Sequence, residues 1–470
     1  MNHTHRYFVN TSIAFFFLCV QLIYAEISFK KLNSVLVDNQ ALILGDKRFG
    51  KTKFSNRING CSFQQEAITS HKGFQYIAYY DSSRRVCIAR RRLPETEWKT
   101  IRFSDYKFIN NDAHNTISMG ICPNDGTIHI AFDHHVHPLH YRISKKNAAN
   151  NPNHTKWVPS LFSPIQSYLE KDKSIKITYP KFWQTPNGGL QFCYRKGGSG
   201  NGARMLVDYD SKQGEWKNTR QIDSPKGDFK DEMSTSHSRN SYPNGYTYGP
   251  KGYLHTTFVW RENAKVGANH DLNYLYSEDG GTFWKNSLGQ AIKGIPNIHS
   301  HGIKAIDIPR KYGLMNTHGQ AVDSQSRIHT VIRHCSDQSF KNAGVKPGQI
   351  LFGPPSAHRY FHYFLNSQKK WEKRELPGKT GNRPKLFVDK NDNLYLICNI
   401  SKRLVIFSSS SKNTWRDWKI IFTSQKSYMN EMLGDYTLWK EFQILSIMAQ
   451  ETPKQSPFSS PLWLINFKAE

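Results

Sequence analysis

The sequence predicts an all-β fold, a seven-bladed β-propeller whose ring is closed by an N-terminal strand. Strand-like segments recur along the chain at intervals of roughly 50 to 75 residues, which leaves room for a four-stranded blade and its loop. Most of these segments open on a turn-forming Gly, Asn or Asp and then alternate apolar and polar residues. No long helical period stands out between them, so the pattern favours strands over helices throughout.

The recurring segments can be followed in order from the first blade to the last. They lie at residues 73–80, 125–132, 188–195, 251–261, 324–334, 391–400 and, more weakly, 441–450. A strand at 33–43 precedes the first segment and is available to complete the final blade. We therefore expect residues 26–470 to form a single propeller domain.

Residues 1–25 have the features of a secretory signal peptide. Arg6 supplies a cationic start, an apolar run extends over 13–20, and Ala25 offers a small residue for cleavage. The run is too short to span a bilayer, and no later segment is apolar enough to do so. We expect a secreted, extracellular and monomeric protein without a membrane partner.

Charge and cysteine content narrow the choice of partner and redox state. The formal net charge of +27 favours a polyanion, and without a nucleic-acid-binding motif we expect acidic polysaccharide and no nucleic acid. The cysteines after the signal are far apart and form no CxxC pair. Buried free thiols are therefore expected, although secretion permits one or two disulfides. Asn153 and Asn399 head N-glycosylation sequons, so we expect the protein to be a glycoprotein if it passes through a eukaryotic secretory pathway.

One predicted β-hairpin brings two histidines together around a turn signal, Pro-Asn-Asp-Gly, at 123–126. The register that makes the apolar faces coincide pairs Ile117 with Phe132, Met119 with Ile130 and Ile121 with Ile128. Continuing this register sets His135 opposite His114 and His134 opposite Asn115, with an uncertainty of one residue. Two imidazoles therefore meet at the open end of the hairpin, ready to share a substrate, a proton or a metal.

Further charged side chains fall at equivalent ends of later segments. Arg195 and Arg261 end two of the repeat strands, as His134 ends its own. Loops beside these ends carry Tyr179, Asn240 and Tyr242. Because equivalent strand ends of a propeller lie on one face around the central channel, we expect these groups to converge there.

This set of residues suits β-elimination from a uronic acid. An arginine can pair with the uronate carboxylate and so make the C5 proton more acidic. A histidine or tyrosine can remove that proton, and another can protonate the departing O4. These motifs contain no G-x-S-x-G elbow and no evident carboxylate pair, either of which would indicate hydrolysis.

Four segments carry a resemblance to a known family. Residues 78–91, 114–141, 178–202 and 237–262 resemble the BNR-type propeller polysaccharide lyases, which include ulvan lyases and L-rhamnose-α-1,4-D-glucuronate lyases. The resemblance implies a secreted lyase that cleaves the L-rhamnosyl-(1→4)-glucuronate bond of ulvan or gum arabic type polysaccharide by β-elimination. The product would carry a 4,5-unsaturated uronate.

The resemblance also implies roles for individual residues. Arg195 would neutralise the uronate carboxylate, Tyr179 would be the general acid, and His134 would orient the substrate. The base stays open between His114 and Tyr179, and a one-residue bulge would exchange His134 for His135. Weaker candidates for sugar contacts are Asn115, His135, Asn240, Tyr242 and Arg261.

Two other functions compete with the lyase. A non-catalytic propeller lectin for acidic glycans would keep Arg195 and Arg261 but would not need His114 with Tyr179. A sialidase-like hydrolase is suggested only by the segment SEDGGTFWKN at 277–286, which resembles an Asp-box, a turn that usually serves structure.

We predict no catalytic metal or cofactor. The run of His134, His135, His137 and His140 lies in a strand-to-loop segment that fixes no tetrahedral geometry and lacks a second ligand cluster. The resemblance leaves room for a structural calcium or zinc elsewhere in the propeller. Candidate ligands for such an ion are His301, His318, His329, His334 and Cys335.

Overall fold

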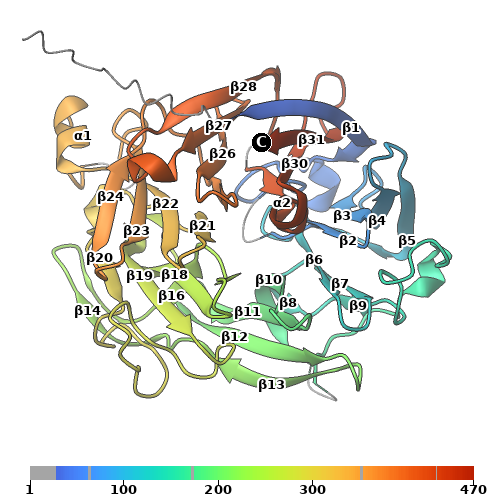
Figure 1. The fold of residues 1–470 in the computed structure, drawn as a ribbon, viewed down its shortest axis with the longest axis horizontal. Coiled ribbons are helices and arrows are strands. Elements are labelled where there is room, and N and C mark those ends of the chain that lie inside the picture. Colours follow the sequence, from blue (N-terminus) through green and yellow to red (C-terminus); the bar gives the residue numbers. More distant parts are fainter. Residues whose placement is uncertain (1–27, 62–64, 171–173, 350–352, 430, 470) are drawn as a thin grey trace, which may run out of the picture.

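Seven β-sheets are arranged as blades around a central channel in a computed structural model of the protein (Figure 1). The structure describes residues 28–61, 65–170, 174–349, 353–429 and 431–469. This is the propeller that the sequence predicts. The expected signal peptide lies outside the described residues. Within them, no helix is both long and apolar enough to cross a membrane.

The first three blades follow one another along the chain. The first contains β2 (Ile68–His71), β3 (Phe74–Tyr80), β4 (Arg85–Arg92) and β5 (Lys99–Lys107). The second contains β6 (Ile117–Cys122), β7 (Thr127–Phe132) and β9 (Tyr141–Ile143). The third contains β10 (Lys176–Gln184), β11 (Leu190–Gly198), β12 (Asn201–Asp210) and β13 (Glu215–Gln221), with β8 (His135–Pro138) added beside β10.

The next three blades repeat this arrangement. The fourth contains β16 (Asn240–Pro243), β17 (Thr247–Tyr248), β18 (Leu254–Arg261), β19 (Asn269–Ser277) and β20 (Lys304–Ile306). The fifth contains β21 (Gly319–Val322), β22 (Ile328–His334), β23 (Arg359–Leu365) and β24 (Trp371–Glu375). The sixth contains β25 (Lys385–Val388), β26 (Leu394–Ile400), β27 (Arg403–Ser409) and β28 (Lys419–Ser427).

The seventh blade is built from both ends of the described chain. Its strands, from the channel outward, are β29 (Leu433–Gly434), β30 (Ile444–Gln450), β31 (Ser459–Ala469) and β1 (Phe29–Leu42). β1 pairs antiparallel with β31, so that Val35 lies opposite Leu464 (Figure 1). The predicted closure of the ring by an N-terminal strand is confirmed.

Short elements complete the chain outside the blades. β14 (Lys226–Lys230) and β15 (Thr235–Ser238) form a hairpin between the third and fourth blades. The two α-helices are α1 (Asp337–Asn342) and α2 (Tyr436–Phe442), and α2 lies near the middle of the ring in Figure 1. Single 3-10 turns occupy Lys47–Phe49, Pro159–Leu161, Val266–Ala268, Arg310–Tyr312 and Ser411–Asn413.

The seven recurring segments of the sequence all become the same element of a blade. Each forms the second strand from the channel, namely β3, β7, β11, β18, β22, β26 and β30. These strands lie between two others within their blade, and most of their residues are inaccessible to solvent. A fully buried aliphatic or aromatic side chain contributes about 1.5–3 kcal/mol, so these strands make a substantial contribution to the core.

Burial affects the cysteines and one of the two predicted glycosylation sites. The six described cysteines are all buried and form no disulfide with one another, as expected for thiols. Asn399 is also buried, and its amide nitrogen donates to the backbone carbonyls of Tyr428 and Met429. The Asn399 sequon is therefore closed to glycosylation in the folded protein, whereas Asn153 is exposed.

Candidate active site

Antiparallel pairing brings the predicted groups to one end of the inner strands. Arg195 on β11 lies opposite Thr178 on β10, next to Tyr179. In the fourth blade, Arg261 on β18 lies opposite Asn240 on β16. The second strand of each blade therefore ends where its innermost strand begins, which gathers both arginines and the tyrosines at this end of the channel.

The second blade carries the histidine hairpin with the predicted register. Ile117 lies opposite Phe132, and the pairing continues to Cys122 and Thr127. Beyond Phe132 the chain leaves this register, because Asp133 adopts a left-handed backbone conformation with φ of 63°. The next two side chains consequently point to different places.

His135 is the histidine that meets His114. Their rings stack with centroids 4.3 Å apart and planes 20° from parallel. Asp112 joins them, because one carboxylate oxygen accepts a hydrogen bond from Nδ1 of His114 at 2.8 Å and the other accepts one from Nδ1 of His135 at 2.8 Å. The ring of Phe54 packs edge-on against His114 at 4.0 Å.

His134 lies apart from this pair. Its Nε2 accepts a hydrogen bond from the backbone N–H of His140 at 2.8 Å, and its ring packs on that of His140. Burial lowers the pKa of His134 well below its ordinary value, so the ring is neutral. The expectation that His134 faces the substrate beside His114 is not met, because the turn at Asp133 exchanges it for His135.

Asp112 fixes the tautomer of His114. Burial raises the pKa of this carboxyl, but hydrogen bonds from His114 and His135 outweigh it and hold the pKa well below its usual range. An ionised carboxylate only accepts hydrogen bonds, so Nδ1 of His114 carries a proton and Nε2 carries the lone pair. Burial lowers the pKa of His114 to about 4 against the effect of Asp112, so the ring is neutral at pH 7.

Tyr179 lies between the histidines and the arginines. Its ring centroid is 5.8 Å from that of His114 and 5.8 Å from that of Tyr242. The backbone of Tyr179 is left-handed, with φ of 57°, which coincides with a break in the pairing of β10 and β11. Burial and the neighbouring Tyr242 raise the pKa of Tyr179, so its hydroxyl keeps its proton at neutral pH.

Tyr242 is held between two guanidinium groups. Nη1 of Arg195 donates to its hydroxyl oxygen at 3.2 Å and Nη1 of Arg261 donates at 3.0 Å. Burial raises the pKa of Tyr242, but the charges of the two arginines outweigh it and lower that pKa to about 7. The predicted convergence of Arg195 and Arg261 is therefore observed.

Arg195 retains unused hydrogen-bonding capacity. Its Nε and Nη2 are buried and have no hydrogen-bond partner among the residues that the structure describes. The guanidinium carbon lies 5.0 Å from the centre of the Tyr179 ring. A buried donor without a partner costs about 1–3 kcal/mol, and more when it is charged, which an incoming carboxylate would relieve.

The two predicted asparagines support the site from behind. Oδ1 of Asn240 accepts a hydrogen bond from the backbone N–H of Gly200 at 2.5 Å and so anchors the glycine-rich loop. Nδ2 of Asn115 donates to Asp133 and also contacts Nδ1 of His137 at 3.2 Å. Both asparagines are fully buried, and Oδ1 of Asn115 has no hydrogen-bond partner among the described residues.

A sequence model of the BNR repeat-containing family matches residues 74–379, more than half of the chain. The chain belongs to this family. The match begins on β3 and extends past β24, so it contains Asp112, His114, Tyr179 and both arginines of the site.

Characterised relatives of this BNR repeat protein share part of its length. The long isoform of ulvan lyase from Glaciecola sp. (strain KUL10) is 25% identical over 291 residues, which are 52% of this chain and 28% of the relative. The chain thus spans less than a third of that relative. The short isoform from Alteromonas sp. (strain LOR) is 25% identical over 288 residues, and 53% of its length is covered.

Solved structures share the fold of this BNR repeat protein. The polysaccharide lyase Uly1 superposes with a TM-score of 0.72 at 16% identity, over 93% of this chain and 99% of that one. A PL25 ulvan lyase bound to -[GlcA(1-4)Rha3S]- superposes with a TM-score of 0.64 at 12% identity, over 93% and 96% of the two chains.

Sequence reasoning missed two charged groups of this BNR repeat site. Asp112 precedes His114 by two residues, and that spacing, in which a carboxylate can reach the next histidine, is the signal that would have found it. Arg383 precedes β25, far along the chain, and its charge acts on Tyr179 and His114 by lowering the pKa of each. It is held by Glu431 at 2.5 Å and by the carbonyl oxygen of Asn316 at 2.8 Å.

Only one group of metal-type ligands gathers among the described residues. Donor atoms of Asp112, His114 and His135 lie within 4.8 Å of one another. Two hydrogen bonds of 2.8 Å explain this proximity. Three of the ligands expected for a structural ion have other contacts: Nε2 of His318 accepts from the N–H of Arg333, His329 contacts Asp323, and His334 contacts the backbone carbonyl of Cys335.

Proposed function

We propose that this protein is a polysaccharide lyase that acts outside the cell on acidic polysaccharide. The observation that carries the proposal is the meeting of an Asp112-held histidine, a protonated Tyr179 and the unpaired donors of Arg195 in one cluster. Ulvan lyases among the relatives support the same class of reaction. We further propose the L-rhamnosyl-(1→4)-glucuronate bond as the one cleaved, in ulvan or gum arabic type polymers.

Each side chain has a task in the proposed elimination. Arg195 binds the uronate carboxylate and stabilises the charge that develops when C5 loses its proton. Nε2 of His114 takes that proton, the C4–C5 double bond forms, and the bond from C4 to O4 breaks. The hydroxyl of Tyr179 protonates O4, which leaves as the new chain end. These steps use side chains alone and call for no cofactor.

Absorbance near ~235 nm tests the reaction, because elimination creates a conjugated uronate double bond. The protein is incubated separately with ulvan, gum arabic and a sialoglycan. Absorbance should rise with a rhamnose–glucuronate polymer and stay flat with the sialoglycan. Binding without any rise would instead indicate a lectin, and new reducing ends without a rise would indicate a hydrolase.

A further inference from the structure

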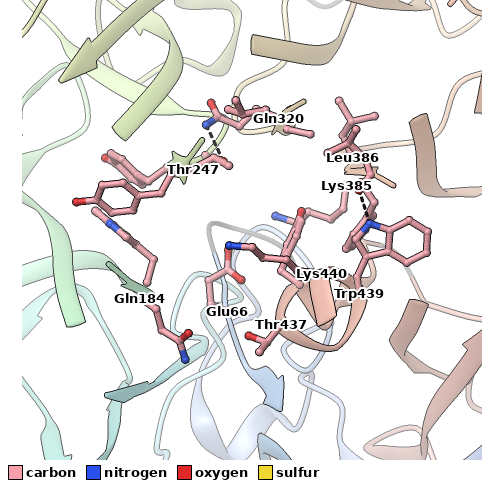
Figure 2. Close-up of a pocket in the computed structure, with 18 of the residues that line it drawn as sticks. Glu66, Gln184, Thr247, Gln320, Lys385, Leu386, Thr437, Trp439 and Lys440 are labelled. Atoms are coloured by element: carbon pink, nitrogen blue, oxygen red, sulfur yellow. Dashed lines mark hydrogen bonds between the residues drawn. The ribbon is translucent and has the colours of Figure 1, made fainter. Parts of the chain in front are cut away.

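A cavity of about 500 Å³ lies in the central channel between the inner strands of the blades (Figure 2). Its lining residues come later on the same inner strands. On β6, residues 119–121 follow His114, and on β10, residues 181–184 follow Tyr179. Asp112, His114, His135, Tyr179, Arg195, Tyr242, Arg261 and Arg383 do not line the cavity. The channel thus has two separate chemical environments.

Lys385, the first residue of β25, is a buried charge facing this cavity. The residue is 4% exposed, and it makes no ion pair or hydrogen bond with its side chain within the described part of the chain. Its side chain reaches toward the open space between Gln320 and Glu66 in Figure 2. Burial lowers the pKa of Lys385 to about 8, so the ammonium is still mostly protonated at pH 7. A buried charge without an ion pair is costly, and an anion that enters the cavity would supply that pair.

Four other charged groups of the cavity have partners, while Lys390 and Lys440 are exposed to solvent. Nζ of Lys181 lies 2.7 Å from a carboxylate oxygen of Glu66. Asp323 accepts hydrogen bonds from Arg327, and Asp389 accepts them from Asn393. These carboxylates have partners of their own, and among the described lysines that line the cavity Lys385 is the buried one without an ion pair.

Aromatic side chains form much of the remaining wall. The rings of Trp183 and Tyr246 stack with centroids 4.3 Å apart and planes 12° from parallel. Tyr248, Tyr436 and Trp439 also line the cavity. Flat apolar faces with a few polar groups are suited to an amphipathic ring such as a pyranose, and the volume lies within the usual range for ligand sites.

We propose that this cavity binds the carboxylate-bearing end of an acidic saccharide, with the carboxylate on Lys385 and the sugar ring against the aromatic wall. This is a second saccharide site, separate from the cluster around His114. It does not depend on the proposed catalytic activity.

The test measures binding of D-glucuronate by calorimetry or NMR titration in an Arg195→Ala background, which weakens binding at the cluster. Adding Lys385→Met should weaken glucuronate binding roughly tenfold or more, because a charge-assisted hydrogen bond is lost. The matched control is Lys412→Met, an exposed lysine outside the cavity, which should leave binding unchanged. Lys385→Met removes a buried charge, so thermal unfolding should show a fold at least as stable.

Two comparison ligands complete the test. D-glucose, which lacks the carboxylate, should bind at least tenfold more weakly than glucuronate, as expected for a charge-dependent site. Inorganic phosphate should compete only weakly. The proposal is overturned if Lys385→Met leaves glucuronate binding intact, if glucose binds equally well, or if phosphate binds as tightly as the sugar acid.

Discussion

His114 and His135 stack face to face at 4.3 Å and share the two oxygens of Asp112. The carboxylate therefore holds both imidazoles in the tautomer that leaves Nε2 with its lone pair. This arrangement makes Asp112 a positioning residue for the proposed base.

Replacing Asp112 with Asn should lower kcat by about 10²-fold or more, since general-base catalysis contributes 10²–10⁴-fold and the wrong tautomer removes it. The rise in absorbance with a rhamnose–glucuronate polymer gives the rate, and substrate binding should change little. His114→Gln should reproduce the loss. If His114→Gln kept its turnover, Tyr179 would be both base and acid.

His134 and His135 form a matched pair for testing the site. His135→Gln should reduce turnover with little effect on stability, because this side chain is partly exposed and contacts Asp112. His134→Gln should mainly lower the melting temperature, because His134 is buried and accepts the N–H of His140. Turnover rates and melting temperatures of both variants test this assignment of His135 to the site and of His134 to the fold. A loss of activity confined to His134→Gln would contradict it.

Tyr179→Phe should abolish turnover and largely spare binding of the polysaccharide. The change removes only the hydroxyl proton that the departing O4 requires, while the ring keeps its contacts with His114 and Tyr242. Single-turnover rates and equilibrium binding measure the two effects separately. Tyr242→Phe is the comparison, and a fully active Tyr179→Phe enzyme would remove Tyr179 from the mechanism.

Arg195→Ala should weaken both binding and turnover, because it removes the donors proposed to pair with the uronate carboxylate. Arg195→Lys should recover only part of the loss, since an ammonium cannot form the same bidentate pair. The readouts are KM and kcat on the same polymer. A substrate whose carboxyl groups are reduced to alcohols should be inert to the unaltered enzyme, and its cleavage would contradict this role.

Stability should fall as the pH drops below about 6.5. Burial lowers the pKa of His129 to about 3, of His255 to about 4 and of His334 to about 3. The unfolded chain binds protons at these histidines near pH 6.5, whereas the folded protein does so only near pH 3–4, so acid favours unfolding. Urea unfolding should give a free energy lower by several kcal/mol at pH 5 than at pH 8. An equal or larger value at pH 5 would show that these histidines are protonated in the fold.

The repeating segments were sufficient to predict the ring, because each becomes the doubly buried second strand of a blade. The innermost strands were harder to see, since β29 has two residues and β21 has four, too few for a period to emerge. The position of Arg195 and Arg261 at equivalent strand ends of a propeller also predicted their convergence. The alternation of apolar and polar residues, together with the turn-forming residues, was therefore enough to predict the architecture.

The parts of the site that escaped prediction depend on backbone geometry and on contacts distant in sequence. The exchange of His134 for His135 follows from the left-handed conformation of Asp133. The sequence does not indicate this conformation, because residues other than glycine seldom adopt it. Arg383 reaches the cluster only because the chain returns to the channel at the start of the sixth blade. Lys385 likewise becomes isolated only when the cavity around it is assembled.

The pairing of β1 with β31 imposes an order on the making of this protein. β1 is made before every other strand that the structure describes, whereas its partner β31 follows all of them in the chain. Until β31 is made, β1 has no strand of its own blade to pair with. Its unpaired backbone N–H and C=O groups can then pair with other chains. The ring can therefore close only late. A chain that is released before residue 459 is made lacks the strand that pairs with β1.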